Sequence, residues 1–217
     1  MIAELLKNSY SIRANRCPLI IYKTNVFWYL MATNSKYHNS KLYYIHGYQS
    51  SPNGDKAILF KEQLDAIPIK YRSCEPEDLI IDDCLKQISS FIKKDKNISL
   101  IGSSLGGFLA AKTAINHLNV KNLILLNPAI IPPSTNLENH QTVPIRILND
   151  MIDKRLFNKK LQTDISIIRG TNDDVVPNKW IFDFAIAQEA NIKFLHDDHR
   201  LSDNFYNLPK IISNILK

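Results

Sequence analysis

From residue 41 onward, short apolar runs alternate with longer amphipathic stretches. The short runs are rich in β-branched and aromatic residues, which is typical of strands, whereas the longer stretches repeat apolar residues at helical spacing. The pattern predicts strands at 42–45, 69–74, 98–101, 123–126, 165–169 and 193–195. It predicts helices at 56–66, 77–93, 104–118, 180–189 and 204–217.

Strands that alternate with helices predict a parallel sheet covered by helices on both faces. The strand at 123–126 is apolar throughout, as expected of a strand buried on both faces. Residues 130–161 break the alternation with three prolines and one helical piece around 146–161, so we interpret them as a small cap insertion over the strand ends. The expected architecture is therefore one compact α/β domain over residues 41–217, with a mostly parallel sheet and no second domain.

Residues 1–40 do not follow this pattern, and we interpret them as an N-terminal extension. Their uninterrupted apolar part, residues 26–32, is far too short for a membrane span. Ala32-Thr33-Asn34 is also a poor site for signal-peptide cleavage. Met31 offers an alternative start of the folded protein. We expect no membrane span.

Composition narrows the class of protein. The chain has 27 Lys and Arg against 21 Asp and Glu, a net charge of +6, and its lysines are scattered rather than clustered. This distribution indicates solubility rather than a nucleic-acid-binding surface. The three cysteines (Cys17, Cys74 and Cys84) have no metal-ligand spacing, so they predict free thiols in a reducing compartment and no metal site.

The strand at 98–101 leads into the candidate chemistry. It is followed by Gly102-Ser103-Ser104-Leu105-Gly106, which has the form Gly-x-Ser-x-Gly. This pattern is typical of a sharp strand-to-helix turn that exposes a serine hydroxyl, with small neighbours where the two backbones approach. A glycine-rich turn that only packs a helix on a sheet is the alternative. Ser104 is therefore the candidate nucleophile.

A serine needs a base, and histidine is the side chain whose proton affinity lies near neutrality. A turn of this kind is followed along the chain by an acid and then by the histidine. Of six histidines, only His196 and His199 come after a suitable acid loop. His196 lies at the end of the last predicted strand, and His199 lies further out in the loop. We favour His199.

The acid is expected in the loop after the strand at 165–169, which reads Gly170-Thr-Asn-Asp173-Asp174-Val-Val-Pro177. Asp173 lies at the centre of this loop and would hold the imidazole in the correct tautomer. Asp174 is the alternative. Either aspartate could instead cap the helix that follows Pro177.

A tetrahedral intermediate needs N–H donors directed at its oxygen. The backbone N–H of Leu105, in the first turn of the predicted helix, is one candidate. The second is expected from the loop His46-Gly47-Tyr48-Gln49, where Gly47 allows close backbone approach. We favour the N–H of Tyr48, with Gln49 as the alternative, and interpret His46 as structural.

Three segments of the sequence resemble the small YqiA-type esterases of the α/β-hydrolase superfamily: Leu42–Pro52, Gly102–Phe108 and Asn127-Pro128-Ala129. The resemblance covers residues 41–217. It implies a compact α/β-hydrolase that cleaves carboxylic esters or acyl thioesters of small molecules, in the cytoplasm and without a cofactor. The last loop departs from the family, which often has Gly-Gly-x-His where this chain has Asp197-Asp198-His199.

The expected activity is that of a serine hydrolase with Ser104, Asp173 and His199 as the catalytic residues and an acyl-enzyme intermediate. The cap would cover the acyl group, with Ile130 and Ile131 lining its pocket. Two alternatives stay open: a binding protein that keeps the fold without catalysis, and a hydrolase that acts on another type of bond. The sequence does not determine acyl length, leaving group or oligomeric state.

Overall fold

The computed structural model describes residues 40–138 and 143–217, and these described residues form one compact unit. The predictions made for residues 1–39, including the alternative start at Met31, lie outside the described residues. Within the described ranges, no helix is long and apolar enough to cross a membrane.

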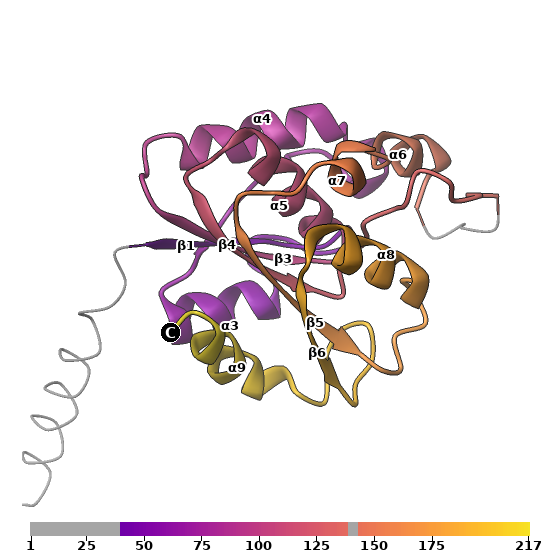
Figure 1. Ribbon diagram of the computed structural model, residues 1–217. Helices are drawn as coiled ribbons and strands as arrows, with labels where there is room; N and C mark the ends of the chain where they lie inside the picture. The colour runs from indigo at the N-terminus through magenta and orange to yellow at the C-terminus, as the bar shows by residue number, and fades with distance from the viewer. Residues whose placement is uncertain (1–39, 139–142) are drawn as a thin grey trace, which may run out of the picture. The chain divides into compact units, whose positions relative to one another are not determined.

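Six parallel strands form one sheet in the order β2-β1-β3-β4-β5-β6 (Figure 1). This arrangement confirms the predicted α/β class. Because all strands run in the same direction, the loops that follow them open on one edge of the sheet. The strands are β1 (Lys41–Ile45), β2 (Ile67–Pro68), β3 (Ile98–Ser103), β4 (Val120–Leu126), β5 (Asp164–Gly170) and β6 (Asn191–Leu195).

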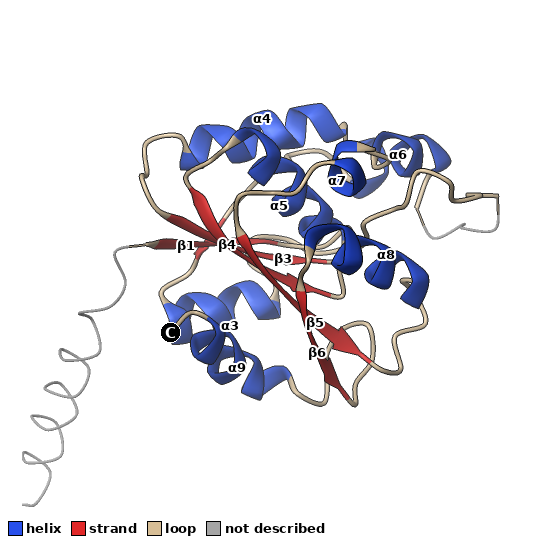
Figure 2. Ribbon diagram, in the orientation of Figure 1, coloured by secondary structure: helices blue, strands red, loops and turns tan. Residues whose placement is uncertain are grey.

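Helices cover both faces of the sheet (Figure 2). One face carries α3 (Asp55–Leu64) and α9 (Leu208–Ile215). The other carries α4 (Ile81–Ile92), α5 (Leu105–Asn116), α6 (Ile145–Asp150), α7 (Arg155–Asn158) and α8 (Asn178–Gln188). Short 3₁₀ turns lie at Pro76–Asp78 and Phe205–Asn207.

The core is divided by the sheet into two apolar layers. The smaller layer, between the sheet and α3 and α9, includes Tyr44, Phe60 and Ile212. The larger layer, beneath α4 to α8, includes Phe108, Leu125 and many other side chains. Apolar side chains of both layers alternate along the central strands, as expected for a sheet buried on both faces.

Two predicted elements between β1 and β3 were wrong. The strand expected at 69–74 is instead β2 at Ile67–Pro68, on the sheet edge where a proline removes no ladder donor. Ile69 still donates its N–H to Tyr44 of β1, but Tyr71 and Arg72 bond the loop after β1 through their side chains. The helix expected at 77–93 begins only at Ile81, because the chain is extended at Leu79 and Ile80. Ile80, the residue before the helix, is 53% exposed.

The region 143–161 also differs from the expected single helical piece. It contains two short helices, α6 and α7, separated by residues 151–154. Leu148, Met151 and Leu156 from this region are buried in the larger apolar layer. Asp153 is buried as well. Its carboxylate accepts hydrogen bonds from the backbone N–H and the guanidinium of Arg155. The segment is therefore packed on the domain rather than projecting from it.

Candidate active site

Ser104 lies between β3 and α5 in a backbone conformation that few residues adopt. Its φ is 52° and its ψ is −117°. Such a conformation costs about 1–3 kcal/mol and persists where surrounding contacts determine it. Here the Ser104 N–H donates to Leu126 O at 2.9 Å, and the Ser104 carbonyl accepts from Ala129 N at 3.0 Å. The end of β4 thus holds the turn that presents the serine.

Two glycines near Ser104 are required because other backbone segments pass too close for a side chain. A Cβ atom on Gly106 would lie 2.1 Å from the carbonyl oxygen of Ile45, and one on Gly102 would lie 2.4 Å from that of Gly106. Both distances are far below contact distance, and both neighbours are backbone atoms that cannot turn aside. The predicted turn therefore requires glycine at both positions.

The structure brings Ser104, His199 and Asp173 together from three separate loops. Ser104 Oγ lies 3.2 Å from His199 Nε2, and His199 Nδ1 lies 2.9 Å from Asp173 Oδ2. The second contact favours the tautomer that carries its proton on Nδ1, which leaves Nε2 free to accept one from the serine. The three side chains have the contacts of a nucleophile, its base and the acid that orients the base.

The carboxylate of Asp173 is fully buried yet held in its charged form. Burial alone would raise the pKa of Asp173, but hydrogen bonds from His199 and from the backbone N–H groups of Val176 and Val175 outweigh it and lower the pKa. Those two N–H groups donate to Oδ1 at 3.0 and 2.8 Å. Asp174, the alternative acid, is exposed.

Sequence reasoning missed Arg169, whose guanidinium lies behind the acid. Its side chain is 1% exposed and donates to the Asp173 carboxylate, to Val176 O at 2.7 Å and to Asn178 Oδ1 at 2.9 Å. Arginine is almost never fully buried unless it is paired. An arginine at the end of the apolar run 165–169 was therefore a signal that a buried partner existed.

Asp197 explains how the histidine loop forms without the Gly-Gly-x-His pattern. Its side chain is buried, and Oδ1 accepts the N–H of Asp198 at 2.8 Å and of Asp203 at 3.1 Å. Oδ2 accepts the backbone N–H of Asn204 at 2.9 Å. This one carboxylate closes the loop around His199. His196, the alternative base, lies at the start of the same loop. Its Nδ1 lies 3.4 Å from Thr171 Oγ1.

The loop after β1 lies beside Ser104, as the predicted oxyanion role requires. A Cβ on Gly47 would lie 3.5 Å from that of Ser104. Residues after β2 hold this loop: Tyr71 Oη donates to His46 O at 3.1 Å, and Arg72 Nη2 donates to Tyr48 O at 2.8 Å. His46 stacks on Tyr71 at a ring distance of 4.3 Å.

His46 is buried, and this burial lowers its pKa to about 4. It is therefore neutral near pH 7. Its Nδ1 lies 2.9 Å from the carbonyl of Gly47, in the same loop. These contacts agree with the structural role predicted for His46.

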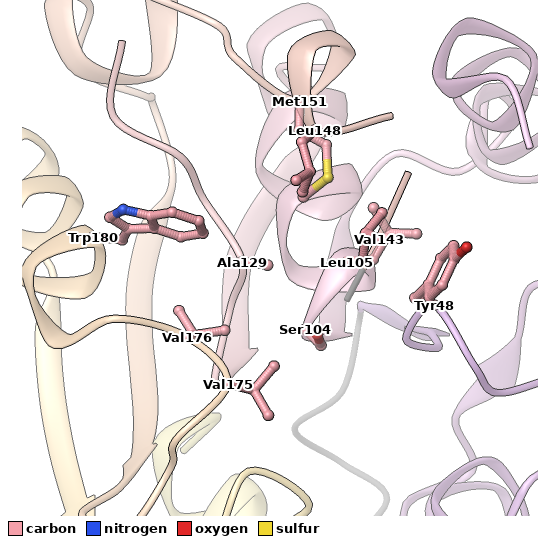
Figure 3. A pocket seen from close by; sticks show the side chains of 10 residues that line it. All are labelled: Tyr48, Ser104, Leu105, Ala129, Val143, Leu148, Met151, Val175, Val176 and Trp180. Carbon is pink, nitrogen blue, oxygen red and sulfur yellow. The ribbon is translucent and has the colours of Figure 1, made fainter. Parts of the chain in front are cut away.

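An apolar pocket of about 50 Å³ opens at Ser104 (Figure 3). Val143, Leu148 and Met151 line it from the region around α6, while Trp180 and Val176 line it from the opposite wall. Its other lining residues are Tyr48, Ser104, Leu105, Ala129 and Val175. The pocket thus includes the serine and both residues predicted to supply the oxyanion donors.

Ile130 and Ile131 were expected to line this pocket, and that expectation was wrong. They are 1% and 0% exposed and belong to the larger apolar layer of the core. Their neighbour Ala129 reaches the pocket instead. Within the described ranges, no group of three or more His, Cys, Asp or Glu side chains is placed to hold a metal ion.

Solved structures with a similar fold are α/β-hydrolases at low sequence identity. Est1E from Butyrivibrio proteoclasticus, solved with ferulic acid bound, matches with a TM-score of 0.66 at 18% identity, over 82% of this chain and 88% of its own. The esterase Pf2001 of Pyrococcus furiosus matches with a TM-score of 0.64 at 15% identity, over 82% and 81%.

A mammalian structure has the same fold. Alpha/beta hydrolase domain-containing protein 10 from mouse matches with a TM-score of 0.63 at 18% identity, over 81% of this chain and 89% of its own. At these identities the matches show that the chain has the α/β-hydrolase fold. No curated protein sequence is detectably similar to the chain.

A family model matches nearly the whole described domain. It is described as "Uncharacterised protein family (UPF0227)", and it matches residues 41–215. This is the YqiA-like esterase family, so the resemblance inferred from three short segments is confirmed. The chain therefore belongs to the UPF0227 family and has the α/β-hydrolase fold.

Proposed function

We propose that the protein is a serine hydrolase that cleaves carboxylic esters or acyl thioesters through an acyl-enzyme intermediate. The observation that carries the proposal is the chain of contacts from Ser104 Oγ to His199 Nε2 at 3.2 Å and from His199 Nδ1 to Asp173 Oδ2 at 2.9 Å. An apolar pocket begins at the same serine. A nucleophile, a base, an orienting acid and a place for an acyl group therefore occur together.

In the first half of the reaction, His199 Nε2 takes the proton of Ser104 as Oγ attacks the carbonyl carbon. The N–H groups of Leu105 and Tyr48 stabilise the oxyanion, and Asp173 stabilises the imidazolium. Collapse of the tetrahedral intermediate breaks the bond to the alcohol or thiol, which leaves with the proton of His199. The acyl group then remains on Ser104 as an ester.

In the second half, a water molecule gives one proton to His199 and attacks the acyl-enzyme. The same donors stabilise the second oxyanion. Its collapse releases the carboxylic acid and returns the proton from His199 to Ser104. Val143, Leu148 and Met151 of the predicted cap contribute to the pocket that would cover the acyl group in both halves.

The pocket favours a short, uncharged acyl group. None of its lining side chains carries a charge, and its volume is about 50 Å³. A carboxylate placed there would lose its hydration without gaining an ionic partner, which is costly. Chain length and charge of the acyl group are therefore the properties to vary.

A graded series of p-nitrophenyl esters and acyl-CoA thioesters tests the proposal. We expect hydrolysis of the short acyl esters, a decline as the chain lengthens, and much slower hydrolysis of a hemisuccinate than of the butyrate ester of equal length. The matched pair separates charge from size. Absence of hydrolysis of every ester and thioester by folded protein would contradict the proposed function and favour a binding protein with this fold.

Replacing Asp173 by asparagine is expected to lower kcat by about 10⁴-fold, because an amide favours the wrong imidazole tautomer. Asp174→Asn is the matched control, since Asp174 is adjacent but exposed. It should retain the wild-type rate. Steady-state kinetics of the two variants on the best ester decide between the acids, and a large loss in Asp174→Asn alone would reverse the assignment.

A further inference from the structure

A buried side-chain network connects the loops that carry Asp173 and His199, and it is centred on a residue whose chain neighbours bind the Ser104 turn through their backbone. Its centre is Asn127, the residue after β4, which is 1% exposed and has a φ of 42°. The backbone on either side of it already holds the serine turn, through Leu126 O and Ala129 N. Asn127 therefore lies next to the nucleophile in the chain while its side chain reaches elsewhere.

The amide of Asn127 binds both of the other loops. Its Oδ1 accepts the N–H of Gly170 at 2.9 Å, at the start of the acid loop. Its Nδ2 donates to the backbone carbonyls of Asp198 at 3.2 Å and His199 at 3.0 Å. One side chain thus contacts the strand that leads into the acid loop and the backbone of the base itself.

Arg169 extends the network to the acid. Its Nη1 donates to Asn127 Oδ1 at 3.3 Å and to Asp173 Oδ2, the carboxylate oxygen that also contacts His199 Nδ1. Its Nη2 donates to the carbonyls of Asp173 and Val176, at 3.2 and 2.7 Å. The guanidinium is therefore bonded to both ends of the turn that presents the acid.

The contacts are more than a core requires. The side chains of Asn127 and Arg169 direct most of their hydrogen bonds to the loops that carry Asp173 and His199. Apolar residues of similar volume would pack there without needing partners. Backbone bonds also join the acid and histidine loops, such as Asn172 N to Asp197 O at 2.8 Å. Asn127, however, also binds the carbonyl of His199, and Arg169 also binds the carboxylate of Asp173.

We propose that Asn127 and Arg169 are positioning residues that set the placement of His199 and Asp173 relative to Ser104. This inference rests on the proposed function, because it assigns these residues a role in the same reaction. Neither side chain touches the pocket, so neither would contact substrate. Their loss should reduce the rate of the chemical step more than it reduces substrate binding.

Asn127→Gly is the most informative variant. Glycine tolerates the positive φ, so the substitution removes the side-chain bonds while keeping the backbone conformation accessible. We expect kcat to fall by about 10- to 100-fold, the loss that a small misplacement of reacting groups produces, with little change in KM. Asn119→Ala is the control, because it removes another amide-to-carbonyl bond, from Nδ2 to Asp95 O, at the other end of β4.

Arg169→Lys and Arg169→Met separate charge from geometry. Both should lose activity, and lysine should retain more than methionine because it keeps a cation beside Asp173. If either protein fails to fold, the Asn127 and Asn119 pair decides the question. A fall in unfolding free energy with unchanged kcat in Asn127→Gly would show a merely structural role and overturn the inference.

A measurement independent of activity completes the test. The proton between His199 Nδ1 and Asp173 should give a far-downfield NMR resonance, assigned by its loss in His199→Gln. In Asn127→Gly it should shift or broaden, while Asn119→Ala should leave it unchanged. A wild-type protein with this resonance but no hydrolysis would contradict the proposed function alone. An unchanged resonance together with an unchanged kcat in Asn127→Gly would overturn the positioning role.

Discussion

The Ser104→Ala variant is expected to hydrolyse esters about 10⁶-fold more slowly than wild type, since the loss of a catalytic serine removes the covalent route altogether. A residual rate above that in water would remain from the oxyanion donors and the pocket. The fold should persist, because the backbone bonds from Ser104 to Leu126 and Ala129 do not involve the side chain. Hydrolysis of the best ester and thermal unfolding measure the two quantities.

Ser103→Ala is the matched control, one residue earlier at the end of β3. A fluorophosphonate probe, which labels activated serines, should modify wild type and Ser103→Ala but not Ser104→Ala. Mass spectrometry of the labelled peptide should place the adduct on Ser104. Labelling of another serine, or undiminished hydrolysis by Ser104→Ala, would refute Ser104 as the nucleophile.

His199→Ala is expected to produce a loss of similar size, about 10⁶-fold in kcat. Without a base, the serine keeps its proton at neutral pH and cannot attack. Because residues of one catalytic unit act together, adding Ser104→Ala to His199→Ala should cost little further activity. Single and double variants assayed on the same ester would show this non-additivity.

His196→Ala provides the comparison for the base. His196 was the alternative in the sequence, and its Nδ1 lies 3.4 Å from Thr171 Oγ1. We expect this variant to keep the wild-type rate. A strongly reduced rate in His196→Ala beside an active His199→Ala would show that the loop rearranges to use the other histidine.

Short-range pattern was sufficient for most elements of the fold. Helix α5 and strands β3 to β6 are predicted by runs of residues whose apolar positions repeat at a fixed spacing. The late start of α4 is different, because side chains distant in sequence bind the backbone before it. Arg146 donates to the carbonyls of Leu79, at 3.0 Å, and of Glu77, which are therefore bound outside a helix. No local pattern around Leu79 contains that information.

The candidate site divides in the same way. The turn predicts Ser104, while order along the chain and position after strands predict His199 and Asp173. These arguments are local or topological. Asn127 and Arg169 were missed as site residues, because their roles depend on carbonyl groups and a carboxylate that only the folded chain brings within reach.

Local patterns along the chain were enough to establish the α/β class, the turn around Ser104 and the few residues that could complete the site, because each of these features depends on residues close together in sequence. The folded chain made the choice of His199 over His196 and of Asp173 over Asp174, because it brings these two side chains to Ser104 and to each other. It also determined that Val143, Leu148 and Met151 line the pocket. The physical reason is that residues from separate loops meet only when the parallel strands bring their carboxyl ends to one edge of the sheet.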